Sequence, residues 1–155
     1  MSEKITAYYA EDHDRLDGLF RTFQELKKKD FPKAKEAFVQ FLFGLKRHII
    51  WEEDILFPLF EKKTGMFEGG PTAVMRAEHV MIKKELEAIH DKVAEGSPET
   101  DEAEEKLVSV LTLHNEKEES ILYPAIDRLV SDAEAAQIFK RMEDIPPERY
   151  ETCCY

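Results

Sequence analysis

The stretch that decides the fold is His48-Ile-Ile-Trp-Glu-Glu-Asp-Ile-Leu-Phe-Pro58, which returns later in the chain as His114-Asn-Glu-Lys-Glu-Glu-Ser-Ile-Leu-Tyr-Pro124. Both copies share the pattern His-x-x-x-Glu-Glu-x-Ile-Leu-x-Pro. Residues four apart on a helix lie on one face, so each histidine projects beside the glutamate one turn later. The repeat therefore predicts two helices that each present an imidazole and a carboxylate on the same face.

Two further histidines obey the same repeat. The interval from His13 to His48 is 35 positions, and the interval from His79 to His114 is the same. An acid directly precedes both His13 and His79. A fixed interval of this kind indicates a duplicated helical hairpin. Two such hairpins, packed about a pseudo-twofold axis, would bring one histidine per helix to a shared level.

Helical periodicity runs through almost the whole chain and is interrupted by a few groups of glycine and proline. The interruptions leave four long helices and one short one, predicted at residues 4–28, 33–61, 71–94, 98–130 and 132–142. Short connections between long amphipathic helices favour antiparallel neighbours. We therefore predict an all-α fold: an antiparallel up-down-up-down four-helix bundle with a short C-terminal helix over residues 1–145, then a tail over residues 146–155 that carries Cys153 and Cys154.

Local signals set the expected helix ends. Pro71 and Pro98 suit first helical positions, Ser97 is expected to cap the fourth long helix and Gly96 to end the third, and Ser131 with Glu134 forms a predicted capping box. Pro58 and Pro124 are expected to bend the second and fourth helices.

Composition excludes several classes of function. The chain has 155 residues, which suits one domain. Its formal net charge of -11 disfavours binding to nucleic acid or to anionic lipid, because both are negatively charged. Its apolar runs are too short to span a membrane, and its N-terminal residues lack the pattern of a secretion signal, so we expect a cytoplasmic location. Two adjacent cysteines cannot form a disulfide framework spread through a fold.

The residues around both motifs predict that the glutamates are buried. Apolar side chains continue the same helix faces: Phe41, Leu45, Ile55, Leu56, Leu107, Leu111, Ile121 and Leu122. Burying two carboxylates is costly, and no lysine or arginine shares these faces. A metal would balance the charge, and imidazole with carboxylate suits iron, and also manganese, zinc or copper. The predicted ligands are His13, His48, Glu52, His79, His114 and Glu118. If both glutamates bridge two octahedral metals that also share an oxo or hydroxo group, about one position per metal stays open.

At these residues, over about residues 5 to 130, the chain resembles the hemerythrin-like proteins, also called the HHE cation-binding domain. The resemblance implies a four-helix fold, two iron ions with an oxo or hydroxo bridge, and the six ligands named above. Oxygen-carrying members have a further histidine one turn after the third-helix histidine and an aspartate five positions after the last motif histidine. Lys83 and Glu119 occupy those positions here. We therefore expect a more symmetric centre, with two histidines per metal, and not a reversible oxygen carrier.

Several other residues have two readings each. Glu53 and Glu119 lie beside the ligand face and are expected to be solvated or to hold a ligand from outside. Tyr9 either packs in the core or reaches a molecule bound to the metals. Asp17 is either a seventh ligand or part of a salt bridge at the bundle edge. His90 does not fit the repeat and is expected at the surface.

The first functional hypothesis is a non-haem di-iron protein that binds or reduces a small oxidant: dioxygen, peroxide or nitric oxide. Peroxide- or nitric-oxide-directed oxidoreductase activity is left open. A second hypothesis is a non-catalytic iron- or oxygen-responsive sensor or iron-handling module. A third is a metal-free bundle with buried histidines. The expected partner is a small diatomic or peroxide ligand, with no nucleic acid and no membrane, and the sequence points to no particular protein partner.

Overall fold

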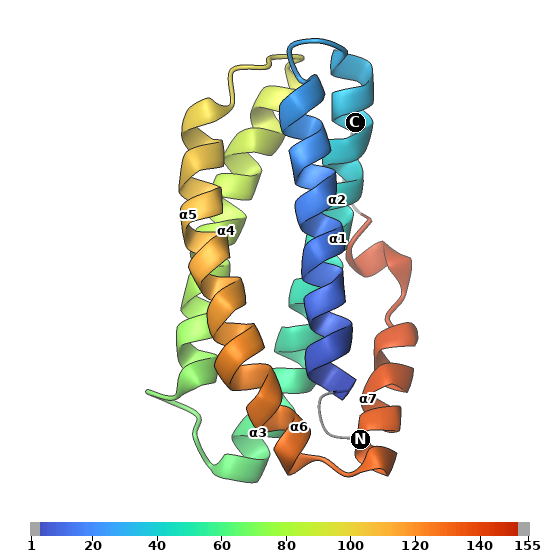
Figure 1. The fold of residues 1–155 in the computed structure, drawn as a ribbon, viewed down its shortest axis with the longest axis vertical. Helices are drawn as coiled ribbons and strands as arrows, with labels where there is room; N and C mark the ends of the chain where they lie inside the picture. Colours follow the sequence, from blue (N-terminus) through green and yellow to red (C-terminus); the bar gives the residue numbers. More distant parts are fainter. Residues whose placement is uncertain (1–3, 152–155) are drawn as a thin grey trace.

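In the computed structural model, residues 4–151 are described, and helices account for nearly all of them with no strand in that range. The predicted all-α class is confirmed. The long helices form rods that lie side by side (Figure 1), and two of these rods consist of several helical segments. The rods are α1 (Lys4–Leu26); α2 (Phe31–Trp51) with η1 (Glu52–Leu56) and α3 (Phe57–Thr64); α4 (Pro71–Ala94); and α5 (Asp101–Lys117) with η2 (Glu118–Leu122) and α6 (Tyr123–Leu129). The shorter α7 (Asp132–Glu143) and the 3-10 turn η3 (Pro147–Arg149) follow.

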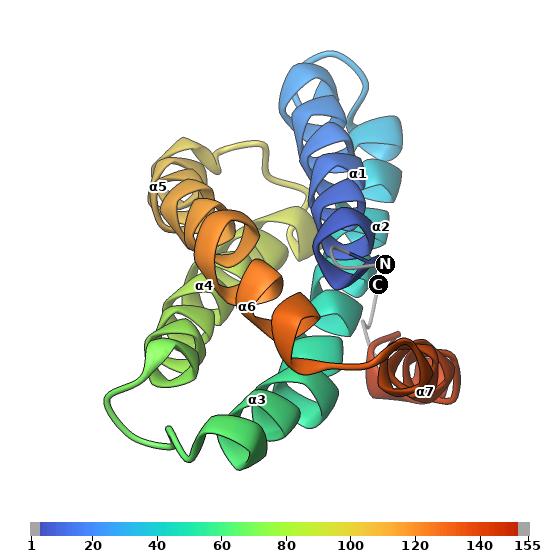
Figure 2. The ribbon, with the colours of Figure 1, turned by 60° about the horizontal axis from the view of Figure 1, so that its bottom comes forward.

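The rods associate as two hairpins. Helix α1 packs along α2, α4 packs along α5, and α6 returns to α1 (Figures 1 and 2). The Leu16 side chain packs directly over Gly44 within the first hairpin, since a Cβ atom at Gly44 would lie 2.6 Å from Leu16 Cδ2. Helix α7 lies outside the four rods, against η1 (Figure 2).

Most predicted helix starts are confirmed. Pro71 lies in the first turn of α4, and Ser131 with Glu134 forms the capping box of α7. The second rod begins slightly earlier than predicted, at Phe31, because the Asp30 side chain accepts a hydrogen bond from the backbone N–H of Lys33.

The predicted start of the fourth long helix was wrong. Helix α5 begins at Asp101 with Thr100 as N-cap, so Ser97 is not the cap and Pro98 is not in the first turn. Lys27 donates hydrogen bonds to Thr100 and Glu104, and these contacts hold the start of α5 three residues later than predicted. The Ser97 hydroxyl instead accepts a hydrogen bond from the backbone N–H of Glu99 in the connecting turn.

The two motif prolines are each preceded by a π-helical turn, in η1 and in η2. In both turns the backbone N–H that precedes the proline donates to the carbonyl five residues back, from Phe57 to Glu52 and from Tyr123 to Glu118. Proline has no N–H and its ring crowds the carbonyl four residues back. That carbonyl for Pro58 belongs to Asp54, and Arg141 Nη2 of α7 donates to it at 3.4 Å.

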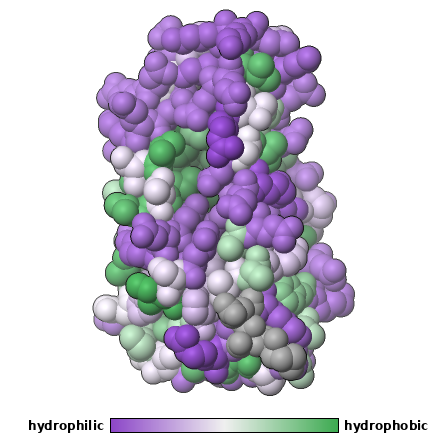
Figure 3. Space-filling model, viewed as in Figure 1, coloured by the Kyte–Doolittle hydropathy of each residue, from purple (hydrophilic) through white to green (hydrophobic). Residues whose placement is uncertain are grey.

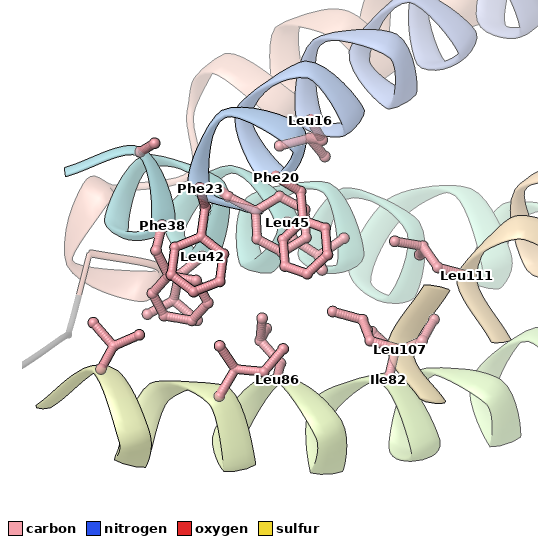
Figure 4. Close-up of a cluster of buried hydrophobic side chains, with 14 of the residues drawn as sticks. Leu16, Phe20, Phe23, Phe38, Leu42, Leu45, Ile82, Leu86, Leu107 and Leu111 are labelled. Atoms are coloured by element: carbon pink, nitrogen blue, oxygen red, sulfur yellow. The ribbon is translucent and has the colours of Figure 1, made fainter. Parts of the chain in front are cut away.

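Two hydrophobic clusters fill the interior, one on each side of the motif histidines along the rods. The first, drawn in Figure 4, gathers phenylalanines and leucines of the first hairpin with aliphatic residues of α4 and α5. The second joins the N-terminal half of α1 to η1, α3, α6 and α7. In α1, α4 and α5 the histidine lies between the residues of one cluster and those of the other, and in α2 His48 lies at the border, between Ile49 of the first cluster and Trp51 of the second on one side and Leu45 of the first on the other. The fold therefore places a polar layer between two apolar ones.

One predicted core residue is exposed. Ile121 leaves 59% of its surface open, whereas Ile55, its counterpart in the first copy of the motif, is 2% exposed. Helix α7 packs against η1, and its residues Ile138 and Met142 belong to the same hydrophobic cluster as Ile55. The prediction for Ile121 was wrong because only one of the two copies receives this cover.

The end of the described chain docks on the first hairpin. Arg149 Nη2 lies 2.8 Å from Asp54 Oδ2, and the Arg47 guanidinium lies 5.8 Å from the centre of the Tyr150 ring. Cys153 and Cys154 lie outside the described residues. Figure 3 shows that the face seen in Figure 1 is mainly hydrophilic, with hydrophobic patches between. Within residues 4–151, every helix is too short or too polar to cross a bilayer.

Candidate metal centre

The structure brings the six predicted ligands together in the polar layer. His13 comes from α1, His48 from α2, His79 from α4 and His114 from α5, and all four side chains are buried. The two glutamates have no exposed surface; they open the π-helical turns, Glu52 in η1 and Glu118 in η2. A π turn widens the helix at one point and is common at functional sites.

The six residues divide into two groups of four that share both glutamates. His13 and His48 form what we call the first position, and His79 and His114 form the second position. In each group the ligand atoms lie within 4.8 Å of one another. Donor atoms this close suit one metal ion per group.

The two oxygens of each glutamate face different positions. Glu52 directs Oε2 to His48 Nε2 at 3.5 Å and Oε1 to His79 Nε2 at 3.0 Å. Glu118 directs Oε1 to His13 Nε2 and Oε2 to His114 Nε2, both at 3.2 Å. Each carboxylate therefore lies between a histidine of its own hairpin and one of the other hairpin, which is the arrangement that bridging requires.

Four further carboxylates lie outside these six residues, and each of them pairs with one of the four histidines. Together the four pairs form a closed ring. Each pair joins a carboxylate on one rod to the Nδ1 atom of a histidine on the next, and the fourth rod returns to the first. The pairs are Asp12 with His48 at 2.8 Å, Glu53 with His79 at 2.7 Å, Glu78 with His114 at 2.9 Å and Glu119 with His13 at 2.7 Å. We refer to these four pairs as the carboxylate ring.

The carboxylate ring fixes the tautomer of the four motif histidines. An ionised carboxylate can only accept, so each Nδ1 carries the hydrogen and donates it. The Nε2 lone pair then points inward, which is the form that binds a metal. Cations at the surface balance most of the outer acids: Arg15 pairs with Asp12, Lys83 with Glu53 and Lys117 with Glu78.

The buried carboxylates of Glu52 and Glu118 raise the pKa of two histidines beside them, His48 and His79. Burial lowers the pKa of the His48 imidazole, but the charge of Glu52 and the hydrogen bond with Asp12 outweigh burial and raise the pKa to about 10. Burial also opposes protonation of His79, but the nearby carboxylate of Glu52 and the hydrogen bond with Glu53 outweigh burial and raise the pKa of His79 to about 9. Metal ions supply the same positive charge and displace these protons when they bind.

Unpartnered atoms test whether a metal fits. Five buried side-chain atoms of the described residues make no hydrogen bond, and three of them belong to the six residues: Glu52 Oε1, His79 Nε2 and Glu118 Oε2. Glu52 Oε1 and His79 Nε2 are 3.0 Å apart without hydrogen-bond geometry, and all three atoms belong to the second position. Buried polar atoms without partners are costly in a native fold. A cation bound between them would satisfy all three, so the residues fit a metal.

A small cavity opens onto the six residues. Besides them it is lined by apolar residues of all four rods, together with Asp17 and Asn115. Its volume is about 10 Å³ for the centre of a water-sized molecule. That is room for about one water.

The repeat contained one site residue that the sequence analysis did not single out. Tyr123 is fully buried, and its hydroxyl donates to Glu52 Oε2 and lies 2.9 Å from Glu118 Oε1. Burial and the charges of Glu118 and Glu52 raise the pKa of this phenol well above its usual value. The sequence did contain a signal for Tyr123: the residue before the motif proline is Phe57 in the first copy and Tyr123 in the second.

The residues with two readings are also placed. The Tyr9 hydroxyl donates to Met142 Sδ at 3.2 Å, so Tyr9 belongs to the second hydrophobic cluster. Asp17 is exposed and lies outside both ligand groups. His90 is partly buried at the surface, 3.5 Å from carboxylate oxygens of Glu87 and Asp91. Glu53 and Glu119 hold histidines from outside as members of the carboxylate ring.

Fold and site together define the class: an all-helical protein whose interior presents a histidine and carboxylate metal-binding site. The model of the hemerythrin HHE cation-binding domain matches residues 4–144. The chain therefore belongs to the hemerythrin HHE cation-binding family.

Two curated relatives match the chain. It is 30% identical over 152 residues to an uncharacterized hemerythrin-like protein of Schizosaccharomyces pombe, covering 93% of this chain and 71% of the relative. It is 28% identical over 126 residues to a protein of Nostoc named DNA nickase, covering 81% of this chain and 34% of the relative. The chain thus spans only about a third of the Nostoc protein. No solved structure matches it.

Proposed function

We propose that this chain is a non-haem di-iron protein that binds or reduces a small oxidant, namely dioxygen, peroxide or nitric oxide. In this proposal the rods form an antiparallel four-helix bundle. Two iron ions are held by His13, His48, His79, His114, Glu52 and Glu118. The observation that carries it is that each buried glutamate directs its two oxygens to two different histidine pairs. Two hard oxygen bridges with two imidazoles at each position suit iron.

Each group of residues has a defined task. Iron, when bound, supplies redox chemistry and open coordination positions for the small ligand. The carboxylate ring keeps every imidazole in the binding tautomer, and Glu52 and Glu118 link the two positions. The cavity between the apolar layers limits entry to molecules of about the size of water. The net charge of -11 also disfavours a nucleic-acid partner.

The test is elemental analysis of protein purified without added metal, with visible absorption recorded before and after dioxygen, peroxide or nitric oxide is added. About two irons per chain are expected from two ligand groups. Absorption that responds to one of the three oxidants would identify the ligand. A folded protein with no metal, or with zinc and no spectral response, would contradict the proposal.

A second candidate, an iron- or oxygen-responsive module, rests on a specific observation. Glu52 faces His79 of the other hairpin, and Glu118 faces His13 of the other hairpin. Bound metal would therefore clamp the two hairpins together, and metal loss would loosen them. Limited proteolysis of the chain with and without chelator tests this candidate. A sensor becomes sensitive to protease when the metal is removed, whereas resistance unchanged by chelator removes the basis of this candidate.

A further inference from the structure

The two copies of the motif differ at one buried position beside the metal-binding groups. Phe57 and Tyr123 each precede a motif proline, and both side chains are fully buried. The Phe57 ring stacks on His79 with 5.6 Å between ring centres, and the Tyr123 ring stacks on His13 at 5.8 Å. The two rings therefore occupy equivalent places, and only Tyr123 adds a hydroxyl.

This hydroxyl contacts all four donor atoms of the first position. Its oxygen lies 2.9 Å from Glu118 Oε1, 3.1 Å from His48 Nε2 and 3.4 Å from His13 Nε2, and it donates to Glu52 Oε2. The second position has no such hydroxyl within the described chain, and three of its four donor atoms make no hydrogen bond. The first position is thus filled by a protein oxygen, and the second is not.

The separations are those of neighbouring donors around one metal. Ligands bound at about 2.1 Å and at right angles to each other lie about 3 Å apart. The phenol oxygen has about this spacing to Glu118 Oε1, His48 Nε2 and His13 Nε2, and it donates a hydrogen bond to the fourth donor, Glu52 Oε2. The hydroxyl has one proton and can donate it to only one of the four donors at a time. All four, two carboxylate oxygens and two imidazole lone pairs, are electron-pair donors that a cation can bind. A metal ion among these five atoms would satisfy all of them.

We propose that Tyr123 is a fifth protein donor at the first position, so that the small ligand binds at the second position, beside Phe57. This inference rests on the proposed di-iron function and assigns different tasks to the two irons. When the phenol oxygen binds ferric iron, the O–H bond breaks, an oxygen–iron bond forms and the proton is released to solvent. No electron is transferred in that step.

The test is resonance Raman spectroscopy of the ferric protein, with iron content measured on the same sample. The wild-type chain is expected to show a visible phenolate-to-iron charge-transfer band with enhanced phenolate ring vibrations. Tyr123→Phe should abolish both signals and keep both irons, because the six other ligands are unchanged. Tyr9→Phe is the matched control: it removes another buried tyrosine hydroxyl, which bonds Met142, and should keep the phenolate signals.

Two further samples guard against a variant that does not fold. Wild-type chain labelled with ring-deuterated tyrosine should shift the enhanced vibrations, which assigns them to tyrosine without any substitution. Phe57→Tyr should strengthen the phenolate band by placing a second phenol beside His79. Two irons per chain with no phenolate signal would overturn this inference and leave the di-iron function standing. A signal that survives in Tyr123→Phe would also overturn it, whereas a chain without iron would contradict the di-iron function itself.

Discussion

Two buried polar clusters in this protein differ in whether they balance their own charge. At the end of the bundle drawn at the top of Figure 1, Lys27 donates to Thr100, Asp101 and Glu104. Glu104 also accepts from Gln24, so this cluster holds its own cation and its own donors. The central cluster has two fully buried glutamates and three atoms without a hydrogen bond. Burial of charge alone does not mark a binding site; the incomplete balance does.

The largest effect is expected from Glu52→Gln, because Glu52 serves both metal positions. The amide keeps the size of the side chain but removes the charge and one oxygen donor, so iron content should fall from about two per chain to below about one. Elemental analysis measures it. Glu61→Gln is the matched control, since Glu61 is buried but paired with Arg76 and Thr72. Retention of two irons in Glu52→Gln would show that this carboxylate does not bridge.

A smaller effect on the same cluster is expected from Glu53→Ala, which removes the acceptor for His79 Nδ1. The imidazole loses its fixed tautomer and orientation, so metal affinity should fall by about 10- to 100-fold. Competition with a chelator of known affinity measures the change. Glu87→Ala removes an exposed acid beside His90 and should leave the affinity unchanged. Equal affinities for the two variants would mean that the carboxylate ring does not support the ligands.

Lys27→Met tests the self-balanced cluster. We expect unfolding free energy to fall by about 2 kcal/mol, between the roughly 1 kcal/mol of exposed pairs and the roughly 3–5 kcal/mol of fully buried ones. The intermediate value follows because Lys27 and Glu104 are buried whereas Asp101 is exposed. Urea unfolding followed by circular dichroism measures it. Iron content should stay unchanged, and loss of iron would show that the two clusters are energetically linked.

The smallest effect concerns the pH dependence of the Lys27 cluster. Burial lowers the pKa of Lys27, but hydrogen bonds with Asp101 and Glu104 outweigh burial and raise the pKa above its usual value of 10.5. A raised folded pKa means that the stabilisation is complete below the unfolded pKa and is lost as pH rises through the folded one. The stability difference between wild type and Lys27→Met should stay constant near neutral pH and shrink only above about pH 10.5. A difference that already shrinks near neutral pH would contradict the raised pKa.

Much of the site could be predicted because the repeat has a fixed interval. Spacing alone placed His13, His48, His79 and His114 at one level, and the i to i+4 rule placed Glu52 and Glu118 beside them. The carboxylate ring could not be predicted in the same way, because each of its bonds crosses from one rod to the next and depends on the rotation of neighbouring helices. The hydroxyl of Tyr123 was missed for a similar reason: periodicity places a side chain on a face but does not locate its terminal atom.

The fold was predicted least well where tertiary contacts override local signals. Ser97 and Pro98 have the chemistry of a helix start, yet α5 begins at Asp101, where Thr100 and Glu104 join Lys27 of the first hairpin. Ile121 has the spacing of a core residue but lacks the cover that α7 gives to Ile55. The π-helical turns were expected only as bends, because proline identifies the place of a distortion and not its form.

The carboxylate ring also sets an order of events during synthesis on the ribosome. Only the Asp12–His48 pair joins two residues of the first hairpin, whereas each of the other pairs needs α4 or η2. Glu119, which orients the first histidine of the chain, is among the last of these residues to be translated. The nascent first hairpin can therefore hold at most one of its imidazoles in the binding tautomer. Both groups of four residues are therefore complete only after η2 has been translated and has packed against α1.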